Sequence, residues 1–382
     1  MTVDRALPTP EAHDLLDLVR EIITKDVAPR AAGDEADGRF PREVFTTLGR
    51  AGLLGLPYPE EHGGAAQPYE VYLQVVEELA GAFLAVGLGV SVHTLSSFPL
   101  AAYGAQDRRA DLLPAMIGGE LLGAYCLSEP QSGSDAAALT TRAQAADGGY
   151  VVDGVKAWTT HGGVADFYTL MARTSGDGAR GISCFHVPAD TPGLSFGRPE
   201  RKMGMRSSPT AQVRLDGVRL GPEALIGGEG EGFRIAMAAL DGGRLGIAAC
   251  AVGVAQAALD TAVSYARERR QFGRRIADFQ GLGFLLADMA TQIAAARSLY
   301  LDAARLRDAG RPYGTRAAMA KLFATDAAMK ITTDAVQVLG GYGYVEDFPA
   351  ERLMREAKVL QIVEGTNQIQ RVVISRALTK ES

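Results

Sequence analysis

A single carboxylate near the C-terminal end, Glu364, stands in a setting that suits proton abstraction. It follows an apolar run that includes Val359, Leu360 and Val363, and it precedes Gly365. Thr366 then opens a segment of helical apolar period, where a threonine is typical of a helix N-cap. Partial desolvation at such a turn would raise the carboxyl pKa and favour a general base. The alternative is a solvated glutamate stabilised by the helix dipole, and the stretch alone does not decide between them.

Two stretches in the middle of the chain could contact a flat or carbonyl-rich ligand. The loop 126–135, CLSEPQSGSD, is rich in hydroxyls and small residues, so it can present backbone N–H groups, although a plain connecting loop has the same composition. The segment 158–163, WTTHGG, holds the only tryptophan, whose indole could pack on a cofactor ring while threonine hydroxyls reach its heteroatoms. A core position for Trp158 and a simple loop role for His161 are the alternatives.

Three further stretches lie in the C-terminal half. Residues 267–275 hold five arginines around Gln271-Phe272-Gly273, which suits a pyrophosphate clamp or, alternatively, a solvated basic turn. The segment 337–344 contains Gly340-Gly341, either a helix C-cap or a place of close backbone approach to a ligand; it follows a predicted helix, so it is not a Rossmann fingerprint. Asp241-Gly242-Gly243-Arg244 interrupts a long helical pattern with two glycines, which indicates a packing or binding reason.

The elements that must position these residues follow an α–β–α order. Helical patterns are expected at about 10–23, 41–52, 69–79 and 108–117, and later at about 235–270, 279–309, 315–339 and 366–378. Between them the residues are β-branched and aromatic. Strands are expected at 167–171 and 182–187, and hairpins are expected at Asp153-Gly154 and Asp216-Gly217. We therefore predict a mostly α protein with an inserted antiparallel β domain: a helical domain at 1–120, a β domain at 121–228 and a four-helix bundle at 229–382.

Composition narrows the function classes. The 382 residues carry a net charge of −6, which argues against a nucleic-acid partner. Cys126, Cys184 and Cys250 are odd in number and far apart, so they predict no metal site, no disulfide framework and a reduced, cytoplasmic setting. The longest apolar run, 79–92, is too short to span a bilayer, and residues 1–10 lack the apolar core of a secretory signal. We expect no membrane partner.

Taken together and in this order, the stretches resemble the acyl-CoA dehydrogenase family over essentially the whole chain. The resemblance implies FAD as cofactor, an acyl-CoA substrate, electron-transferring flavoprotein as electron acceptor and a homotetramer. Glu364 matches the base that removes the α-proton of the thioester while the β-hydrogen leaves as hydride to flavin N5. The matched cofactor positions are Leu127, Ser128, Gly133, Ser134, Trp158, Thr160, Arg269, Gln271, Phe272, Gln280, Gln337, Gly340, Gly341, Thr366 and Gln368. Ser134, Asp241, Arg244 and Gly365 match substrate-binding positions, and some adenine-dinucleotide contacts of the family reach across a subunit interface.

Departures from the family pattern bear on the chemistry. A minority of the family carries its base immediately before the position of Arg244, but here that position is Gly243, so Glu364 stands as the base. His161 replaces a frequent Asn, and Gln131-Ser132 replaces a common Gly-Ala.

The expected acyl pocket at 80–105 holds no Lys or Arg, which disfavours a glutaryl-type substrate. Gly87 and Gly89 are expected to leave space and Phe98 to shorten the cavity. A short- or medium-chain, possibly branched, acyl group is favoured. An oxidase or monooxygenase on the same fold, a carrier-protein thioester as substrate, and a non-catalytic flavoprotein or scaffold remain alternatives.

Overall fold

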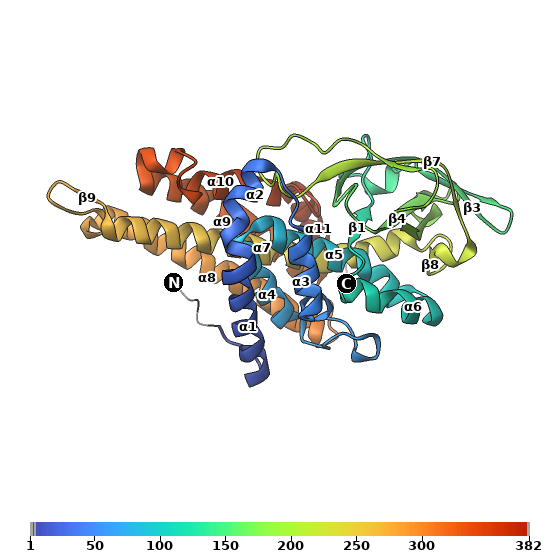
Figure 1. The fold of residues 1–382 in the computed structure, drawn as a ribbon, viewed down its shortest axis with the longest axis horizontal. Helices are drawn as coiled ribbons and strands as arrows, with labels where there is room; N and C mark the ends of the chain where they lie inside the picture. Colours follow the sequence, from blue (N-terminus) through green and yellow to red (C-terminus); the bar gives the residue numbers. More distant parts are fainter. Residues whose placement is uncertain (1–2, 4, 380–382) are drawn as a thin grey trace.

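The computed structural model describes residue 3 and residues 5–379, and it has the predicted α–β–α order (Figure 1). The N-terminal helices are α1 (Pro10–Ile22), α2 (Ala31–Asp37), α3 (Arg42–Arg50), α4 (Tyr69–Ala82), α5 (Leu84–Tyr103) and α6 (Gln106–Ile117). The hydroxyl of Thr9 caps α1 by accepting from the N–H of Ala12. The apolar run 79–92 divides at Phe83, whose extended backbone separates α4 from α5.

The central region is a mixed sheet of eight strands. They are β1 (Gly123–Cys126), β2 (Arg142–Ala146), β3 (Gly149–Thr160), β4 (Phe167–Arg173), β5 (Ile182–Pro188), β6 (Leu194–Phe196), β7 (Thr210–Leu220) and β8 (Leu225–Ile226). The spatial order is β6-β7-β3-β2-β4-β5-β8, with β1 beside β4. Most pairs are antiparallel as predicted, but β4 pairs in parallel with both β1 and β2.

Both predicted Asp-Gly hairpin turns are wrong. Asp153-Gly154 lies inside β3 and Asp216-Gly217 lies inside β7, and the two pairs face each other across a register shift in the ladder. The carboxylate of Asp153 accepts from the N–H of Gly217 at 2.7 Å, so the residues form opposed bulges. The real turn between β2 and β3 is Asp147-Gly148, where both residues have positive φ.

The C-terminal region consists of long helices joined by short connections. They are α7 (Gly232–Glu268), α8 (Gln280–Asp308), α9 (Gly314–Leu339), α10 (Pro349–Leu360) and α11 (Asn367–Thr379), with the small ribbon β9 (Arg270–Gln271) and β10 (Arg274–Arg275) between α7 and α8. Sequence reasoning missed α10, which packs against both α7 and α9, whereas α11 packs against α9. The period of Ala350, Leu353, Ala357 and Leu360 was the signal for it.

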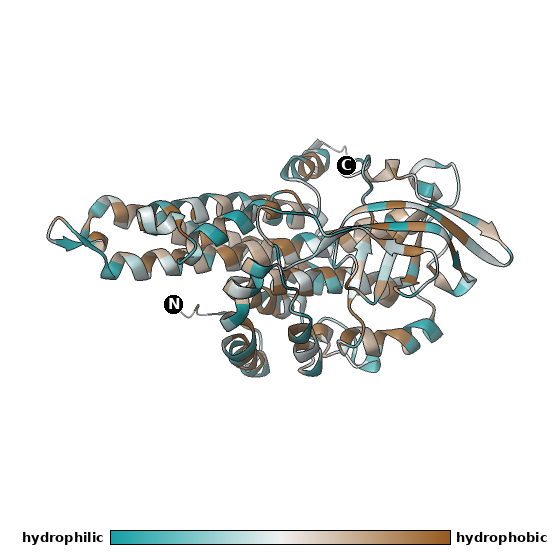
Figure 2. Cartoon of the chain, turned by 45° about the horizontal axis from the view of Figure 1, so that its top comes forward, coloured by the Kyte–Doolittle hydropathy of each residue, from teal (hydrophilic) through white to brown (hydrophobic). Residues whose placement is uncertain are grey.

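The helical regions share one apolar core although they are far apart in sequence. Helices α4 and α5 pack on α7, and their buried residues form a single cluster with those of α8 and α9. Helices α5 and α7 are long and apolar enough to span a membrane, but most of each lies inside the molecule. Apolar residues run along the central helices in Figure 2, whereas the tip at β9 is hydrophilic.

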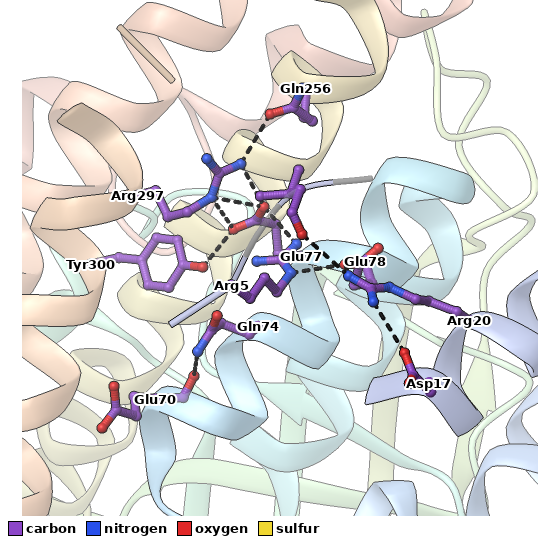
Figure 3. Close-up of polar contacts among 11 residues, drawn as sticks. Arg5, Asp17, Arg20, Glu70, Gln74, Glu77, Glu78, Gln256, Arg297 and Tyr300 are labelled. Atoms are coloured by element: carbon purple, nitrogen blue, oxygen red, sulfur yellow. Dashed lines mark hydrogen bonds and ion pairs between the residues drawn. The ribbon is translucent and has the colours of Figure 1, made fainter. Parts of the chain in front are cut away.

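A buried ionic network ties the N-terminal segment to this core (Figure 3). Glu77 on α4 is 1 % exposed and accepts 2.8 Å bonds from Arg5 and from Arg297 on α8. The hydroxyl of Tyr300 donates to its other oxygen. Burial alone would raise the pKa of Glu77, but the two guanidinium groups and their bonds outweigh it and lower the pKa.

Candidate active site

Glu364 lies on a tight turn between α10 and α11. Its φ is +55° and that of Gly365 is +86°, so two successive residues have left-handed backbone. This conformation is rare for a non-glycine residue and clusters at functional sites. The predicted cap is confirmed, because the Thr366 hydroxyl accepts from the N–H of Ile369 as α11 begins.

The turn aims the carboxylate at the glycine pair of α7. A Cβ built on Gly243 would lie 2.6 Å from Oε2 of Glu364, and one on Gly242 would lie 3.2 Å from the Tyr69 hydroxyl. The predicted packing reason for these glycines is therefore confirmed. Side chains at either position would displace the groups that now meet there.

One oxygen of the carboxylate is buried without a hydrogen bond. Within the described part of the chain, Oε2 of Glu364 is inaccessible to solvent and has no partner. Burial raises the Glu364 pKa to about 7, against the opposite pull of Arg244 and Lys321. A carboxylate poised near neutrality can abstract a proton, so this is the predicted general-base environment.

Arg244 lies on α7 beside this carboxylate and is almost completely buried. Its guanidinium pairs with Asp241 at 2.5 Å, one turn back on the same helix. Its Nε has no hydrogen-bond partner among the described residues. Arg244, one of the residues predicted to contact substrate, thus lies near Glu364 and retains an unused donor.

The loop after β1 and the end of β3 come together as a second part of the site. The carbonyl of Ser128 accepts from the N–H of Ala157, the residue before Trp158. Trp158 is 65 % exposed at a positive φ, so the core alternative for it is wrong. Gly133 and Ser134 are exposed on the same loop.

Sequence reasoning missed the ion pair that holds this second part. Lys156 on β3 is completely buried and donates to Glu129 at 2.8 Å and to the carbonyl of Leu127 at 3.0 Å. The backbone N–H groups of Thr140 and Thr141 also donate to the carboxylate of Glu129. A charged residue at an inward position of a strand was the available signal.

Another group of predicted cofactor positions lies elsewhere, at the tip of the helical bundle, whereas Thr366 and Gln368 lie where α11 begins. Arg269 lies 5.8 Å from the ring of Tyr342, which joins the α7–α8 connection to the end of α9. Phe272 is 91 % exposed at a positive φ. The exposed positions here are Arg269, Gln271, Phe272, Gln280, Gln337, Gly340 and Gly341. Figure 1 shows that this tip, at β9, and the β3–β7 end lie at opposite ends of the long axis, so one chain does not unite them.

Three family models match the chain in the same order as its regions. The N-terminal, middle and C-terminal domains of acyl-CoA dehydrogenase match residues 9–120, 124–218 and 230–379. The chain belongs to the acyl-CoA dehydrogenase family. This family consists of flavoprotein oxidoreductases, so the expected enzyme class and fold are confirmed.

Relatives match nearly the full length of the chain. An acyl-CoA dehydrogenase of Bacillus subtilis is 46 % identical over 97 % of this chain and 98 % of its own. Butyryl-CoA dehydrogenase from Megasphaera elsdenii has a TM-score of 0.96 and 39 % identity, covering 99 % of this chain and all of its own. A chain in the solved structure "Electron transferring flavoprotein of Acidaminococcus fermentans: Towards a mechanism of flavin-based electron bifurcation" has a TM-score of 0.97 and 43 % identity, with 99 % and 100 % coverage.

The expected acyl-pocket region of this acyl-CoA dehydrogenase differs from the prediction. Cβ atoms at Gly87 and Gly89 would lie 2.6 Å from Ala80 and 2.5 Å from Phe45, so neighbouring side chains already occupy the space expected there. Phe98 packs edge-on against Tyr103, 6.1 Å away. Helices α5 and α7 are in close contact where a Cβ on Gly246 would lie 2.0 Å from the Ser91 hydroxyl.

His161, which stands where the family often has Asn, is a buried packing residue. Its ring packs against both Phe40 and Phe45, which stack on each other, and Nδ1 is 2.9 Å from the carbonyl oxygen of Gly123. Burial lowers its pKa to about 4, so it is neutral at physiological pH. It lies in the turn after β3, in agreement with the predicted loop role.

Proposed function

We propose that this enzyme removes the α-proton and the β-hydride of a short-chain acyl-CoA to give the trans-2-enoyl-CoA, with Glu364 as base. The observation that carries the proposal is the buried, unpartnered Oε2 of Glu364 at a left-handed turn against Gly243. Gly243 has no side chain to act as a base, so the proton goes to Glu364. The net change is loss of two hydrogens from the Cα–Cβ bond.

FAD is the proposed hydride acceptor, and the residues fit it. The indole of Trp158 offers an exposed flat face, and Gly133, Gly340 and Gly341 have open space where a Cβ would stand. Leu127, Ser128, Ser134 and Thr160 would hold the flavin ring, with Thr366 and Gln368 on α11. The proposed dinucleotide contacts are Arg269, Gln271, Phe272, Gln280 and Gln337 at the bundle tip. When bound, FAD would accept the β-hydrogen as hydride and later pass its electrons to electron-transferring flavoprotein.

The residues of the chain would acidify the α-proton and exclude water. The N–H of Glu364 forms no hydrogen bond within the described residues, so it can donate to the thioester carbonyl oxygen. Gly365, with Arg244 and Asp241, would position the thioester and the pantetheine arm, together with Ser134. A bound acyl chain would desolvate Glu364 further and raise its pKa, which increases its basicity.

A short acyl chain is favoured by the contact between α5 and α7. Gly246 lies three residues beyond Gly243, which is about 4.5 Å along the helix axis. The helices meet there through Ser91, so we expect this contact to limit the length of the acyl chain beyond Glu364. The similarity to a butyryl-CoA dehydrogenase points the same way.

The decisive experiment is an anaerobic titration of the flavin absorbance with acyl-CoAs of increasing length. We expect rapid bleaching by butyryl-CoA and progressively slower bleaching by octanoyl- and palmitoyl-CoA. Absence of bleaching with every acyl-CoA would contradict the function, whereas a preference for palmitoyl-CoA would contradict only the chain length. Oxygen consumption that matches turnover would favour the oxidase alternative.

The position of the bundle tip supports a subunit interface within the proposed homotetramer. In one chain its predicted dinucleotide contacts lie at the end of the long axis away from the sheet, to which the strand of Trp158 belongs (Figure 1). A second copy must therefore supply the tip if one FAD is to meet both groups. Phe272→Ala should weaken FAD retention without altering Glu364, as judged by flavin content after gel filtration.

A further inference from the structure

A lysine outside the proposed site lies directly behind the Glu364 turn. Lys321 is on α9, and its side chain is completely buried. Its Nζ donates to the carbonyl of Gly365 at 3.0 Å and to the side-chain oxygen of Asn367 at 2.8 Å. One ammonium group therefore bonds to both sides of Thr366.

Other groups on α9 and α11 secure the same turn. The amide of Asn367 donates to Thr325 at 2.9 Å and to Asp326 at 2.7 Å. The amide of Gln370 donates to the carbonyl of Gly365 at 2.8 Å. The turn consequently stays attached to α9 when the Lys321 ammonium is removed, and a substitution there should fold.

These anchors explain how a strained backbone persists. A left-handed non-glycine residue costs about 1–3 kcal/mol and survives only where its surroundings determine it. Lys321 bonds to the carbonyl of Gly365, the residue after Glu364. The bond therefore fixes the backbone next to Glu364. A small shift there would move Glu364 relative to Gly243.

Lys321 also brings a charge that no carboxylate neutralises by direct contact in the described part of the chain. The charged or titratable groups around Glu364 are Arg244 and Cys250 on α7, Tyr69 on α4, Tyr125 on β1 and Lys321 on α9. Arg244 is paired with Asp241, and Asp326 is paired with Arg371. Burial lowers the Lys321 pKa to about 7, and Glu364 and Asp326 oppose that shift.

We propose that Lys321 is a positioning residue for the base: it holds the Glu364 turn through Gly365 and Asn367, and its positive charge favours the ionised Glu364 carboxylate. The role rests on the proposed function for its catalytic meaning, but the effect on Glu364 is measurable without turnover. Removing the charge by Lys321→Met should make Glu364 harder to ionise. The α-proton would then be abstracted only at higher pH.

The test measures the ionisation of Glu364 and the rate of flavin reduction in the same holoenzymes. For the wild type and for Lys321→Met, the infrared spectrum of the same protein carrying Glu364→Gln is subtracted. The difference spectrum then reports the protonated carboxyl of Glu364 alone. In Lys321→Met we expect its midpoint to rise by about one pH unit, as for loss of a nearby opposite charge. The pH profile of anaerobic flavin reduction by butyryl-CoA should move by the same amount, with about tenfold slower reduction on its acid limb.

Two further variants separate charge from anchoring. Thr325→Val removes a neutral anchor and should slow reduction without moving the Glu364 midpoint. Lys330→Met removes an exposed lysine on the same helix, paired with Asp334, and should match the wild type in both readouts. An unmoved Glu364 midpoint in Lys321→Met would overturn the proposal. If the wild-type flavin is not reduced by any acyl-CoA, the proposed function fails, while the infrared midpoint still decides the role of Lys321.

Discussion

Two carboxylates of the same helical core, Glu77 and Glu364, have opposite hydrogen-bonding environments. Glu77 accepts from Arg5, Arg297 and Tyr300, and its pKa is lowered (Figure 3). Glu364 has an unpartnered oxygen, and burial raises its pKa to about 7. A buried carboxylate whose oxygens all have hydrogen-bonding partners stays ionised, whereas one with an unpartnered oxygen can still bind a proton.

This difference in hydrogen bonding gives Glu77 a structural role and Glu364 a proposed chemical role within one core. The Glu77 network joins the N-terminal segment, α4 and α8, which are distant in sequence. The Glu364 turn is instead anchored by neighbours that bond its backbone and leave its carboxylate alone. The same apolar interior thus supports both, and hydrogen bonding decides which carboxylate can act as a base.

The largest expected effect on stability is at Glu77. Glu77→Gln leaves Arg297 without a counter-charge and Arg5 with only the partly exposed Glu78, so we expect a loss of about 3–5 kcal/mol in unfolding free energy by chemical denaturation. The control is Glu78→Gln, since Glu78 is partly exposed and also pairs with Arg5. It should cost less than about 1 kcal/mol. Equal effects of the two changes would contradict the distinction.

The next largest effect is on catalysis and comes from Gly243. In Gly243→Ala the new Cβ would stand 2.6 Å from Oε2 of Glu364, so the carboxylate must move. Misplacement of a base by about 1 Å slows reaction by about 10²-fold, which anaerobic flavin reduction would measure. Gly33→Ala on α2, where a Cβ would meet nothing within 4 Å, should leave the rate unchanged. A wild-type rate in Gly243→Ala would place the base elsewhere.

A smaller effect concerns stability as a function of pH. The folded-state pKa of Glu364 is raised, so the folded protein binds this proton more tightly and loses stability as pH rises from about 4.5 through 7. Glu364→Gln should therefore be more stable than the wild type by about 1–3 kcal/mol at pH 8 and nearly equal to it at pH 4. Glu77 has the opposite sign, because its lowered pKa stabilises the fold above the ordinary carboxyl pKa and this contribution is lost in acid. Denaturation at both pH values measures the difference, and a destabilised Glu364→Gln at pH 8 would count against a strained, unpaired carboxylate.

Sequence reasoning was successful where chemistry is encoded locally. Thr366 as a cap and a packing or binding reason for Gly242 and Gly243 followed from residue type and spacing, as did the order of helices and strands. It did not succeed where partners come from far away. The sequence around Glu77 does not predict Arg5 or Arg297 as partners, and the sequence around Lys321 does not predict Gly365. These pairs form only after the helices pack.

The two Asp-Gly pairs show the same limit. Each is an ordinary turn signal by itself, yet Asp153 bonds to Gly217 on the neighbouring strand and both remain in the sheet. Gly87 and Gly89 looked like space for an acyl chain, but Ala80 and Phe45 already fill it. A local pattern does not show which distant residues will occupy the space around it.

The most direct test of Glu364 as the base is anaerobic flavin bleaching by butyryl-CoA in Glu364→Gln with FAD still bound. Glutamine keeps the shape of the side chain and cannot accept the α-proton, so we predict normal flavin content and bleaching slowed by at least about 10²-fold. Bleaching at the wild-type rate in that variant would contradict the assignment.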